Sequence, residues 1–535
     1  MRDDRALAHF GRAGDHHLAR GFTHTELLSA CAGEHLRVDA RFRIMPCHER
    51  GSAMPPASPS PALLVPDHAL ARSVSDSFGK VTVPAGVLWG AQTARSLHFF
   101  AIGEQKMPLG IIHALAWIKW AAAQVNRDLQ LQEPLMAQAI CHAAEQVARG
   151  AFDDQFPLSA WQTGSGTQSN MNVNEVIATL AMQALVQGKT SGGSVHPNDD
   201  VNLGQSSNDV FPSAMHIAVA VSAQQQLLPA LDELRAALAA QAVAFASVVK
   251  IGRTHLQDAT PITFGQELGG YAAQLQLCQD SLQFSLGAVH ALAMGGTAVG
   301  TGINTHPEFG ARVCATLARR LGLPLRQASN LFAAMAGHEA LVALHASLKM
   351  LAIALTKIAN DIRLMASGPR AGLGELTLPQ NEPGSSIMPG KVNPTQVEAL
   401  TMVCAQVLGH DVAISFAASQ GQFELNVYKP LIALNTLDSL RLLADAMRSF
   451  SRFCVVGIAV NQARVDALVQ SSLMLVTALA PHIGYDRAAA IAKHAQSHGT
   501  TLRAAALALG TVSAEQFDAW VDARQMVGAP PQTSH

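Results

Sequence analysis

The segment from Gly384 to Pro394, with the sequence GSSIMPGKVNP, is the part of this chain best suited to chemistry. It combines serine hydroxyls with one lysine, Lys391, and one asparagine, Asn393, and its glycines and prolines favour turns. Because it has no apolar periodicity, it cannot contribute much to a core. Such a loop can bind a small anion and present a hydroxyl to it. The alternative interpretation is an ordinary surface loop.

Three other polar segments interrupt an otherwise apolar sequence. They are TGSGTQSNMNVNEV at 163–176, VHPNDDVNLGQSSND at 195–209 and GRTHLQDATP at 252–261. Each supplies Ser, Thr, Asn or His side chains, which donate hydrogen bonds to carboxylate oxygens without a large charge of their own. Taken singly, each has a structural explanation, since Ser207, Asn208 or Asp209 could cap a helix. Four such segments in one helical chain are hard to explain by capping alone.

Metal binding is the main competing interpretation because the chain has 22 histidines. His494 and His498 have helical ligand spacing, but the pair lacks the glutamate of an HExxH motif and ends at Gly499. We interpret this pair as a helix end. The chain has no Walker loop and no strand–GxGxxG–helix unit, which argues against nucleotides. GGTAVGTG at 295–302 is interpreted as a tight backbone turn close to substrate.

The composition limits the function classes further. Charged residues make up 14% of the chain, the formal net charge is −2 and the pI is 6.9, so nothing indicates nucleic acid or an anionic membrane as a partner. The low charge indicates surface hidden in a large core or, as we favour, between subunits. The seven cysteines never form a CxxC pair, which fits a reducing compartment and argues against a structural zinc site. The apolar runs are interrupted well before about 18 residues, so no membrane span is expected.

The chain is predicted to be mainly α-helical from about residue 73. The clearest helix carries a row of apolar residues spaced by three and four: Leu341, Leu344, Leu348, Leu351, Leu355, Ile358, Ile362 and Met365. Similar Ala/Leu-rich faces occur in segments 213–245, 265–290, 395–420 and 431–452. Long helices joined by short polar links predict a helix bundle.

Three domains are predicted after an N-terminal extension. Residues 1–72 carry His and Arg clusters and a proline-rich linker, and we interpret them as a disordered extension or as sequence upstream of the true start. Scattered acidic residues argue against a transit peptide. The predicted domains are an N-terminal helical domain at 73–205, a central helix bundle at 206–462 and a small C-terminal helical domain with a short tail at 463–535.

The four polar segments and GGTAVGTG, in this order, resemble class II fumarases, the iron-independent enzymes of the aspartase/fumarase superfamily. The resemblance runs from about residue 81 to residue 528 and includes VPAGVLWGAQT near its start and ELNVYKP at Glu424–Pro430. The GSSxMPxKxN loop alone specifies only the superfamily. His255, Ser207 and Gly390 favour fumarases over aspartate ammonia-lyases, which typically have Gln, Thr and Ala at these positions.

The resemblance implies reversible hydration of fumarate to (S)-malate, a tricarboxylic acid cycle reaction that passes through an aci-carboxylate. Ser385 would be the base that removes the proton, and His255, oriented by Glu398, would handle the water side of the reaction. The resemblance also implies a set of substrate-binding residues: Ser165, Thr167, Ser206, Ser207, Asn208, Thr254, Lys391 and Asn393.

The implied fold is mainly α, with three domains and central long helices that form a twenty-helix core in a homotetramer. Each active site would be shared between three subunits, with a small dicarboxylate as substrate and without a metal or organic cofactor. We expect a cytoplasmic enzyme with no nucleic-acid or membrane partner. The alternatives are an aspartate ammonia-lyase and a structural protein related to the superfamily, like some lens crystallins.

A possible second dicarboxylate site is implied at His196, Asn198 and Asp199. The family often has an arginine a few residues before this segment, but here the preceding residues are Gly192, Gly193 and Ser194. Because the cation is missing, we do not expect tight binding there.

Overall fold

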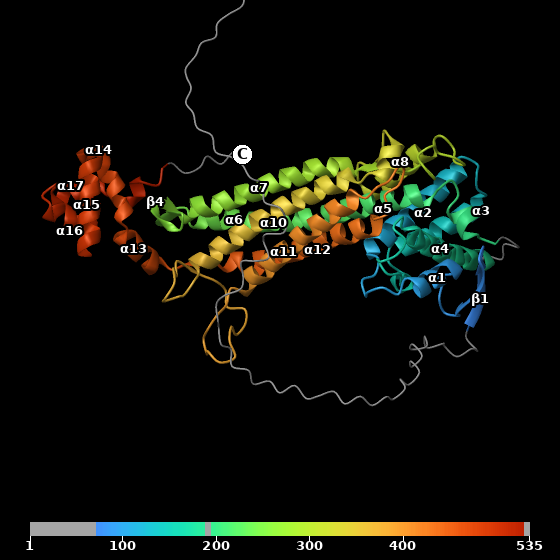
Figure 1. Ribbon diagram of the computed structural model, residues 1–535, viewed down its shortest axis with the longest axis horizontal. Helices are drawn as coiled ribbons and strands as arrows, with labels where there is room; N and C mark the ends of the chain where they lie inside the picture. Colours follow the sequence, from blue (N-terminus) through green and yellow to red (C-terminus); the bar gives the residue numbers. More distant parts are fainter. Residues whose placement is uncertain (1–70, 188–193, 529–535) are drawn as a thin grey trace, which may run out of the picture. The chain divides into compact units, whose positions relative to one another are not determined.

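The computed structural model describes residues 71–187 and 194–528, all of which fall in the unit Pro66–His535. The predicted extension therefore lies outside the described residues, except for Ala71 and Arg72, which already belong to strand β1. The end of the predicted C-terminal tail, from residue 529, also lies outside them. The described chain is mainly α-helical, which confirms the predicted class (Figure 1).

The N-terminal part is a set of helices preceded by a hairpin. Its elements are β1 (Ala71–Asp76), β2 (Gly79–Pro84), α1 (Ala91–Phe99), α2 (Leu109–Asp128), α3 (Pro134–Ala148) and α4 (Thr167–Gln187). Helix α3 begins with a side-chain cap from Glu133 and a proline in its first turn, the position where proline costs no hydrogen bond. Helix α2 is buried along most of its length and packs against α3, α5 and α8.

Long helices dominate the central part (Figure 1). They are α5 (Ser207–Ser222), α6 (Leu228–Ala244), α7 (Phe264–Val289), α10 (Glu339–Met365), α11 (Thr395–Ala418) and α12 (Lys429–Phe453), with the shorter α8 (Phe309–Leu321) and α9 (Leu331–Ala336) between α7 and α10. All eight apolar residues predicted to form one row on α10 are buried, as expected for the core-facing side of a helix. Segment 213–245 differs from the prediction, because its helix begins at Ser207 and widens to a π-turn at Ala223–Leu227.

In the described part of the chain, four two-stranded pairings accompany the helices, and none of them was predicted from the sequence. Besides β1 and β2 they involve β3 (Val249–Thr254) with β4 (Gln257–Thr263), β5 (Ala291–Leu292) with β6 (Arg326–Gln327), and β7 (Leu376–Thr377) with β8 (Ala459–Val460). His255 and Leu256 join β3 to β4 with φ angles of 57° and 60°. Two consecutive residues in the left-handed region form the tight turn that matches the twist of an antiparallel hairpin.

The hydrophobic core has two separate parts. The larger extends from Val83 to Val465 and includes all the long helices. The smaller lies within Leu479–Phe517 and is formed by short helices: α14 (Ala480–Ile483), α15 (Tyr485–His498), α16 (Leu502–Ala508) and α17 (Ala514–Trp520). Helix α13 (Gln462–Ser471) lies between the two in sequence. The predicted domain boundaries at 205 and 462 stay predictions.

Among the described residues, two helices, α10 and α11, are long and apolar enough to cross a membrane by length and composition. A bent pair at Gln462–Ser471 and Leu473–Ile483 could count as a third. The interruptions in their apolar runs therefore do not exclude these helices by length and composition, and the expectation of no membrane span stays a prediction. In the most apolar 18 residues of each helix, 50% are buried within the protein in α10 and 33% in α11. About half of the apolar stretch that gives α10 the composition of a membrane span is thus part of the hydrophobic core.

Candidate active site

The N-terminus of α5 gathers three of the predicted site residues. Ser206 caps the helix: its hydroxyl accepts from the backbone N–H of Asn208 at 3.2 Å, and its own N–H donates to Asp209 Oδ1 at 3.0 Å. Ser207 and Asn208 follow in the first turn. The free N–H groups and the dipole of a helix N-terminus favour an anion there. The capping interpretation and the substrate-binding interpretation therefore apply to the same residues.

Asp209 fastens the glycine-rich turn Gly295–Gly302 to this helix end. Its Oδ2 accepts from the backbone N–H groups of Gly295 and Thr297, each at 3.0 Å, and Asn208 donates to the carbonyl of Ala298 at 2.8 Å. Burial raises the pKa of Asp209 to about 6, although these backbone donors oppose the shift. GGTAVGTG is a tight turn, as predicted, and it lies against the predicted substrate residues.

The predicted residue Ser165 lies in the loop that leads into α4, and Thr167 is the first residue of that helix; the loop is packed against α5. Their hydroxyl oxygens are 2.8 Å apart. A Cβ on Gly164 would lie 1.4 Å from the carbonyl oxygen of Val427, and one on Gly166 would lie 2.3 Å from the ring of Phe211 on α5. Only glycine allows this close approach. Five predicted residues from two segments are thus brought to one place.

The segment ELNVYKP at Glu424–Pro430 is hydrogen-bonded to that loop. The backbone N–H of Lys429 donates to the carbonyl of Gly164 at 3.1 Å, and the Lys429 ammonium donates to the carbonyl of Asn426 at 2.5 Å. Burial lowers the pKa of Lys429 to about 7. His338 lies near Lys429 and is buried. Neither of its ring nitrogens has a hydrogen-bond partner among the described residues.

Thr254 and His255 are exposed at the tip of the β3–β4 hairpin, whose base is anchored by buried charges. Arg253 forms a two-pronged ion pair with the fully buried Glu375, at 2.9 and 2.8 Å. The buried Lys250 lies 3.5 Å from the same carboxylate and 2.7 Å from Glu267. This network holds the hairpin in place while leaving its tip open.

The loop at 384–394 organises its own polar groups. The Ser385 hydroxyl accepts from the backbone N–H groups of Ile387 at 3.3 Å and Met388 at 3.1 Å. Asn393 donates to the carbonyl of Gly384 at 2.6 Å, and the backbone of Gly384 pairs with that of Lys391 at 3.0 Å. In the described part of the chain, the Lys391 ammonium has no ion-pair or hydrogen-bond partner. The same loop therefore carries the Ser385 hydroxyl, held by two backbone donors, and the ammonium of Lys391, unpaired within the described residues.

One chain does not bring all the predicted residues together. Helix α7 follows directly after β4 and has 26 residues, so it is about 39 Å long at 1.5 Å per residue. Its far end contacts α5, where His216 Nδ1 lies 2.9 Å from the carbonyl oxygen of Val289. The hairpin that carries His255 and the residues of α5 thus lie toward opposite ends of α7 (Figure 1).

Helix α11 separates the Ser385 loop from the Ser165 loop in the same way. It begins at Thr395, just after the first loop, and its 24 residues span about 36 Å at the same rise. Near its other end the carbonyl of Ala417 accepts from Asn426 at 2.9 Å, beside the segment that supports Gly164. Glu398 lies exposed in the first turn of α11, and no hydrogen bond joins it to His255 within the described residues.

The residues of the possible second site lie on the exposed turn Pro197–Val201. His196 Nδ1 accepts from the backbone N–H of Asp199 at 3.1 Å, so the histidine caps the turn. Asn198 is exposed on the same turn, and Gly192 and Gly193 lie outside the described residues. The arrangement explains the HPND pattern by local structure.

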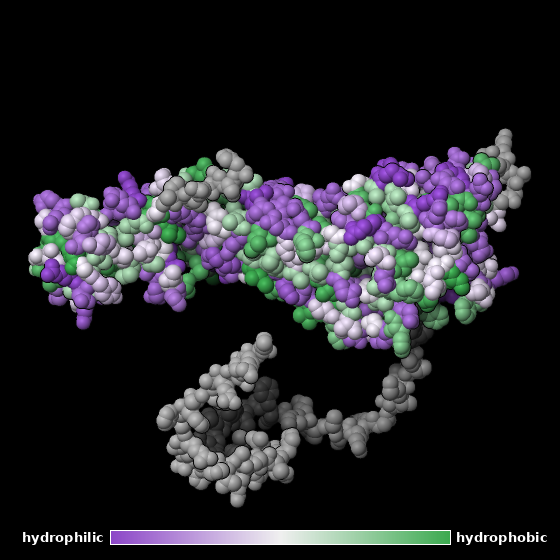
Figure 2. Space-filling model, turned by 90° about the horizontal axis from the view of Figure 1, so that it is seen from above, coloured by the Kyte–Doolittle hydropathy of each residue, from purple (hydrophilic) through white to green (hydrophobic). Residues whose placement is uncertain are grey.

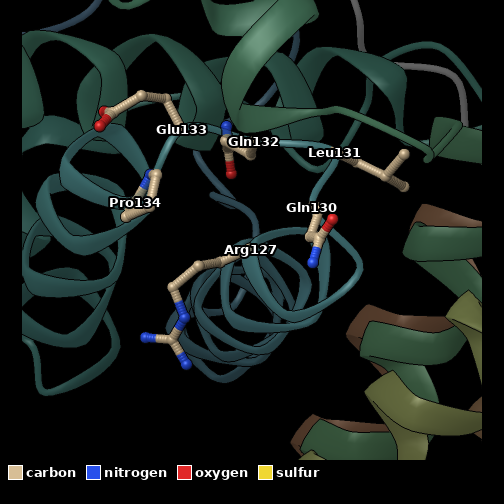
Figure 3. A pocket seen from close by; sticks show the side chains of 6 residues that line it. All are labelled: Arg127, Gln130, Leu131, Gln132, Glu133 and Pro134. Atoms are coloured by element: carbon tan, nitrogen blue, oxygen red, sulfur yellow. The ribbon is translucent and has the colours of Figure 1, made fainter.

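A pocket of about 380 Å³ lies at the junction of α2 and α3 and contains none of the predicted site residues (Figure 3). It is lined by Arg127, Gln130, Leu131, Gln132, Glu133 and Pro134. Gln132 donates to the carbonyl of Asp200 at 2.9 Å, which ties this junction to the exposed turn. Arg127 pairs with Asp128 at 2.8 Å.

The histidine pair that competed as a metal site lies at the end of α15. The His494 and His498 rings stack with centroids 4.1 Å apart, and His498 Nδ1 is 3.0 Å from the carbonyl oxygen of His494. Within residues 71–187 and 194–528, no three His, Cys, Asp or Glu side chains are grouped so that they could hold a metal ion. The pair behaves as a helix end.

Sequence reasoning missed three buried charged residues around the site, Lys119, Glu375 and Lys429, and named Asp209 only as a possible helix cap. Burial lowers the pKa of Lys119 to about 7, and the negative charge of Asp209 opposes that shift. A lysine inside an apolar helical stretch such as IIHALAWIKWAAA was the available signal for Lys119. No local pattern marks Glu375, because its partners come from a distant hairpin.

Comparison with known proteins identifies the class. The family model described as Lyase matches residues 79–409, and the one described as Fumarase C C-terminus matches 475–528. A fumarate hydratase class II from Chromobacterium violaceum is 62% identical over 456 residues, covering 85% of this chain and 99% of the relative. One from Thermosynechococcus vestitus is 58% identical, covering 85% and 97%.

Solved structures agree with the sequence comparison. A crystal structure of class II fumarase from Schistosoma mansoni has a TM-score of 0.83 at 46% identity, covering 85% of this chain and 99% of that one. A fumarate lyase:delta crystallin from Brucella melitensis, bound to cobalt, has a TM-score of 0.82 at 40% identity, covering 86% and 100%. The fold and the polar segments thus define a lyase of the aspartase/fumarase superfamily. Within it, this chain belongs to the class II fumarate hydratase family.

The buried charges behind the hairpin generate a prediction about stability. Glu375→Gln should lower the free energy of unfolding by about 3 kcal/mol, because it leaves the largely buried Arg253 without its carboxylate partner. Urea-induced unfolding followed by circular dichroism measures the change. The control is Asp518→Asn, which breaks the exposed pair with Arg503 and should leave the unfolding curve unchanged. Equal effects of both substitutions would mean that the buried network does not stabilise the fold.

Proposed function

We propose that this lyase catalyses the reversible hydration of fumarate to (S)-malate, a step of the tricarboxylic acid cycle. The observation that carries the proposal is the set of uncharged donors at the N-terminus of α5. Ser165, Thr167, Ser206, Ser207 and Asn208 gather there, where a helix end already favours an anion. A dicarboxylate substrate supplies such an anion, and the class II fumarate hydratase relatives named above support its identity.

The chemistry requires donors rather than a strong base alone. In the direction from malate, a base removes a proton from the carbon beside one carboxylate, and the hydroxyl on the neighbouring carbon leaves as water after it receives a proton. The carbanion between these steps survives only if the carboxylate takes up its charge as an aci-carboxylate. Preorganised donors aimed at that charge are the largest single source of rate. We assign Lys391 and Asn393 to one carboxylate, with Thr254 beside them.

Ser385 is the base in this proposal. A serine hydroxyl is a weak base in water, so its alkoxide needs donors around it. The backbone N–H groups of Ile387 and Met388 already point at the Ser385 oxygen, at 3.3 and 3.1 Å. These two donors, together with the cation of Lys391 on the same loop, would stabilise the alkoxide. This geometry supports the assignment of the base to this loop.

His255, oriented by Glu398, delivers the proton to the leaving hydroxyl in the proposal. His255 sits at the tip of a hairpin and Glu398 at the start of α11, and both are exposed. Each of them is separated by about the length of a helix from the donors at the N-terminus of α5, so other chains must supply the missing pieces of the site. We therefore propose a homotetramer in which three subunits contribute to each active site and the long helices form a twenty-helix core.

The exposed sides of the long helices support an assembly. Large apolar residues on α7, α10 and α11 are more than half exposed: Leu277, Phe284, Ile353, Met402, Val412 and Phe416. Figure 2 shows apolar (green) atoms between polar ones on the face in view. Large apolar side chains exposed on three long helices are typical of an interface in proteins. We assign the apolar faces of α10 and α11 to contacts with other copies of the chain rather than to a membrane.

We place the enzyme in the cytoplasm, without nucleic acid as a partner and without a metal or organic cofactor. Five cysteines among the described residues are free, which fits a reducing compartment: Cys141, Cys278, Cys314, Cys404 and Cys454. The proposed steps use protein side chains and water only. We propose no tight binding at His196, Asn198 and Asp199, because that turn is exposed and satisfied by its own hydrogen bonds.

The first test is absorbance of fumarate in the ultraviolet, with purified protein in a buffer that contains a chelator. We expect absorbance to rise with (S)-malate and to stay level with L-aspartate, because His255 stands where ammonia-lyases typically have Gln. A rise with aspartate alone would reassign the chain to the ammonia-lyases. No change with either substrate would favour a structural protein.

The assignment of the base predicts the behaviour of Ser385→Ala. The variant should fold and assemble like the unchanged protein but lose turnover by about 100-fold or more, the usual contribution of a positioned proton-transfer group. Fumarate absorbance measures turnover, and circular dichroism checks the fold. Ser386→Ala, one residue along the same loop, is the matched control and should keep most activity. Turnover in Ser385→Ala close to that of the unchanged protein would remove Ser385 from its role.

The proposed assembly predicts the mass in solution. Light scattering after size exclusion should give four times the chain mass of 56.4 kDa in buffer without detergent. The apolar faces of α7, α10 and α11 would be covered in such a particle. A single-chain mass, or a requirement for detergent to keep the protein dispersed, would contradict the assembly and reopen the membrane assignment of α10 and α11.

A further inference from the structure

Lys119 is a buried cation that the proposed mechanism does not use. It lies in the middle of α2, and its side chain is completely buried. Its ammonium lies 2.7 Å from Asn202 Oδ1 and 2.9 Å from Gln205 Oε1. Within the part of the chain that the structure describes, no carboxylate forms an ion pair with it. Its two partners are neutral amide oxygens from the segment that leads into α5.

This placement costs stability instead of providing it. A buried cation without a carboxylate partner loses more hydration than two neutral acceptors return. Lys250 shows the contrast: it is equally buried, but it pairs with Glu267 at 2.7 Å. An apolar side chain of similar length at position 119 would avoid the cost. The lysine therefore needs an explanation other than the stability of the fold.

The contacts of Lys119 set the direction of a row of hydrogen bonds. An ammonium group can only donate, so it fixes the orientation of the Asn202 amide with its oxygen toward Lys119. The same oxygen also accepts from Asn170 Nδ2 at 3.3 Å and from Asn174 Nδ2 at 3.3 Å. The side-chain NH₂ group of Asn170 must therefore face Asn202.

The row ends at a predicted substrate residue. Asn170 Nδ2 also donates to the hydroxyl oxygen of Ser207, at 3.0 Å. A hydroxyl has a single hydrogen, and because Ser207 accepts from Asn170, its hydrogen remains free to point elsewhere. Ser207 lies in the first turn of α5, so this hydrogen can be donated to an anion bound at that helix end. The row of hydrogen bonds that begins at Lys119 thus ends at one of the hydroxyl groups assigned to the substrate.

A second contact supports the same helix end. Gln205 accepts from Lys119 through its side chain, and its own NH₂ group donates to the carbonyls of Val201 and Leu203, each at 3.2 Å. Gln205 directly precedes Ser206, the cap of α5. Lys119 therefore contacts Asn202 and Gln205, which both belong to the segment that leads into Ser206 and Ser207.

We propose that Lys119 is a positioning residue for the dicarboxylate site: through Asn202 and Asn170 it forces the Ser207 hydroxyl to donate to the substrate. This inference rests on the proposed function, because it assigns Ser207 to substrate.

Lys119→Met tests the proposal with the full-length protein. We expect the KM for fumarate to rise about tenfold with kcat changed by less than about threefold, because the lost orientation weakens binding of substrate and transition state alike. The melting temperature should stay level or rise. The matched control is Lys493→Met, which removes one exposed positive charge from α15 and should leave KM unchanged. A fall in melting temperature with unchanged KM would show a structural lysine and overturn the proposal.

A double-mutant cycle with Ser207→Ala separates positioning from a general disturbance. Ser207→Ala should raise KM in the unchanged background but add almost nothing to Lys119→Met, because both remove the same donated hydrogen bond. If the fold-changes in KM of the two single variants multiply in the double variant, the two residues act independently and the proposal is overturned. If Lys119→Met does not fold, Asn170→Asp tests the same row, since a carboxylate cannot donate to Ser207, and it should raise KM similarly. If the unchanged protein does not act on fumarate, the proposed function fails and this inference fails with it; an active protein with normal KM in these variants contradicts this inference alone.

Discussion

The fixed rise of the α-helix is the constraint on which the rest of this structure depends. A helix of 26 residues separates whatever precedes it from whatever follows it by about 39 Å, and side-chain flexibility cannot close such a gap. Helices α7 and α11 each place one polar segment at one end and another at the opposite end. The same helices supply the apolar core, so the feature that stabilises the fold also divides the predicted site.

Buried polar networks then position each piece of the site separately. Asp209 ties the glycine-rich turn to α5, Glu375 anchors the hairpin that carries His255, and Lys429 supports the loop of Ser165. None of these three residues is on the predicted substrate list. Their common role is to satisfy backbone or charged groups that would otherwise be buried without partners, which keeps loops rigid where a core cannot.

Much of the fold could be predicted from sequence because burial repeats at helical spacing, as the row from Leu341 to Met365 shows. The β3–β4 hairpin could not, because Lys250 and Arg253 are charged residues in its strand and their partner Glu375 lies far along the chain. The types of the site residues were readable from local motifs. Their separation was not, because it depends on how many turns of helix lie between them in the folded chain.

The position of the predicted residues at opposite ends of the same helices has a consequence for how activity responds to dilution. In the proposed assembly, folding of one chain does not create an active site; association does. Below the concentration at which chains separate, catalysis would disappear while the helices remain intact, and it would depend on protein concentration to a power greater than one. The specific activity of this enzyme would then be a measure of its association equilibrium.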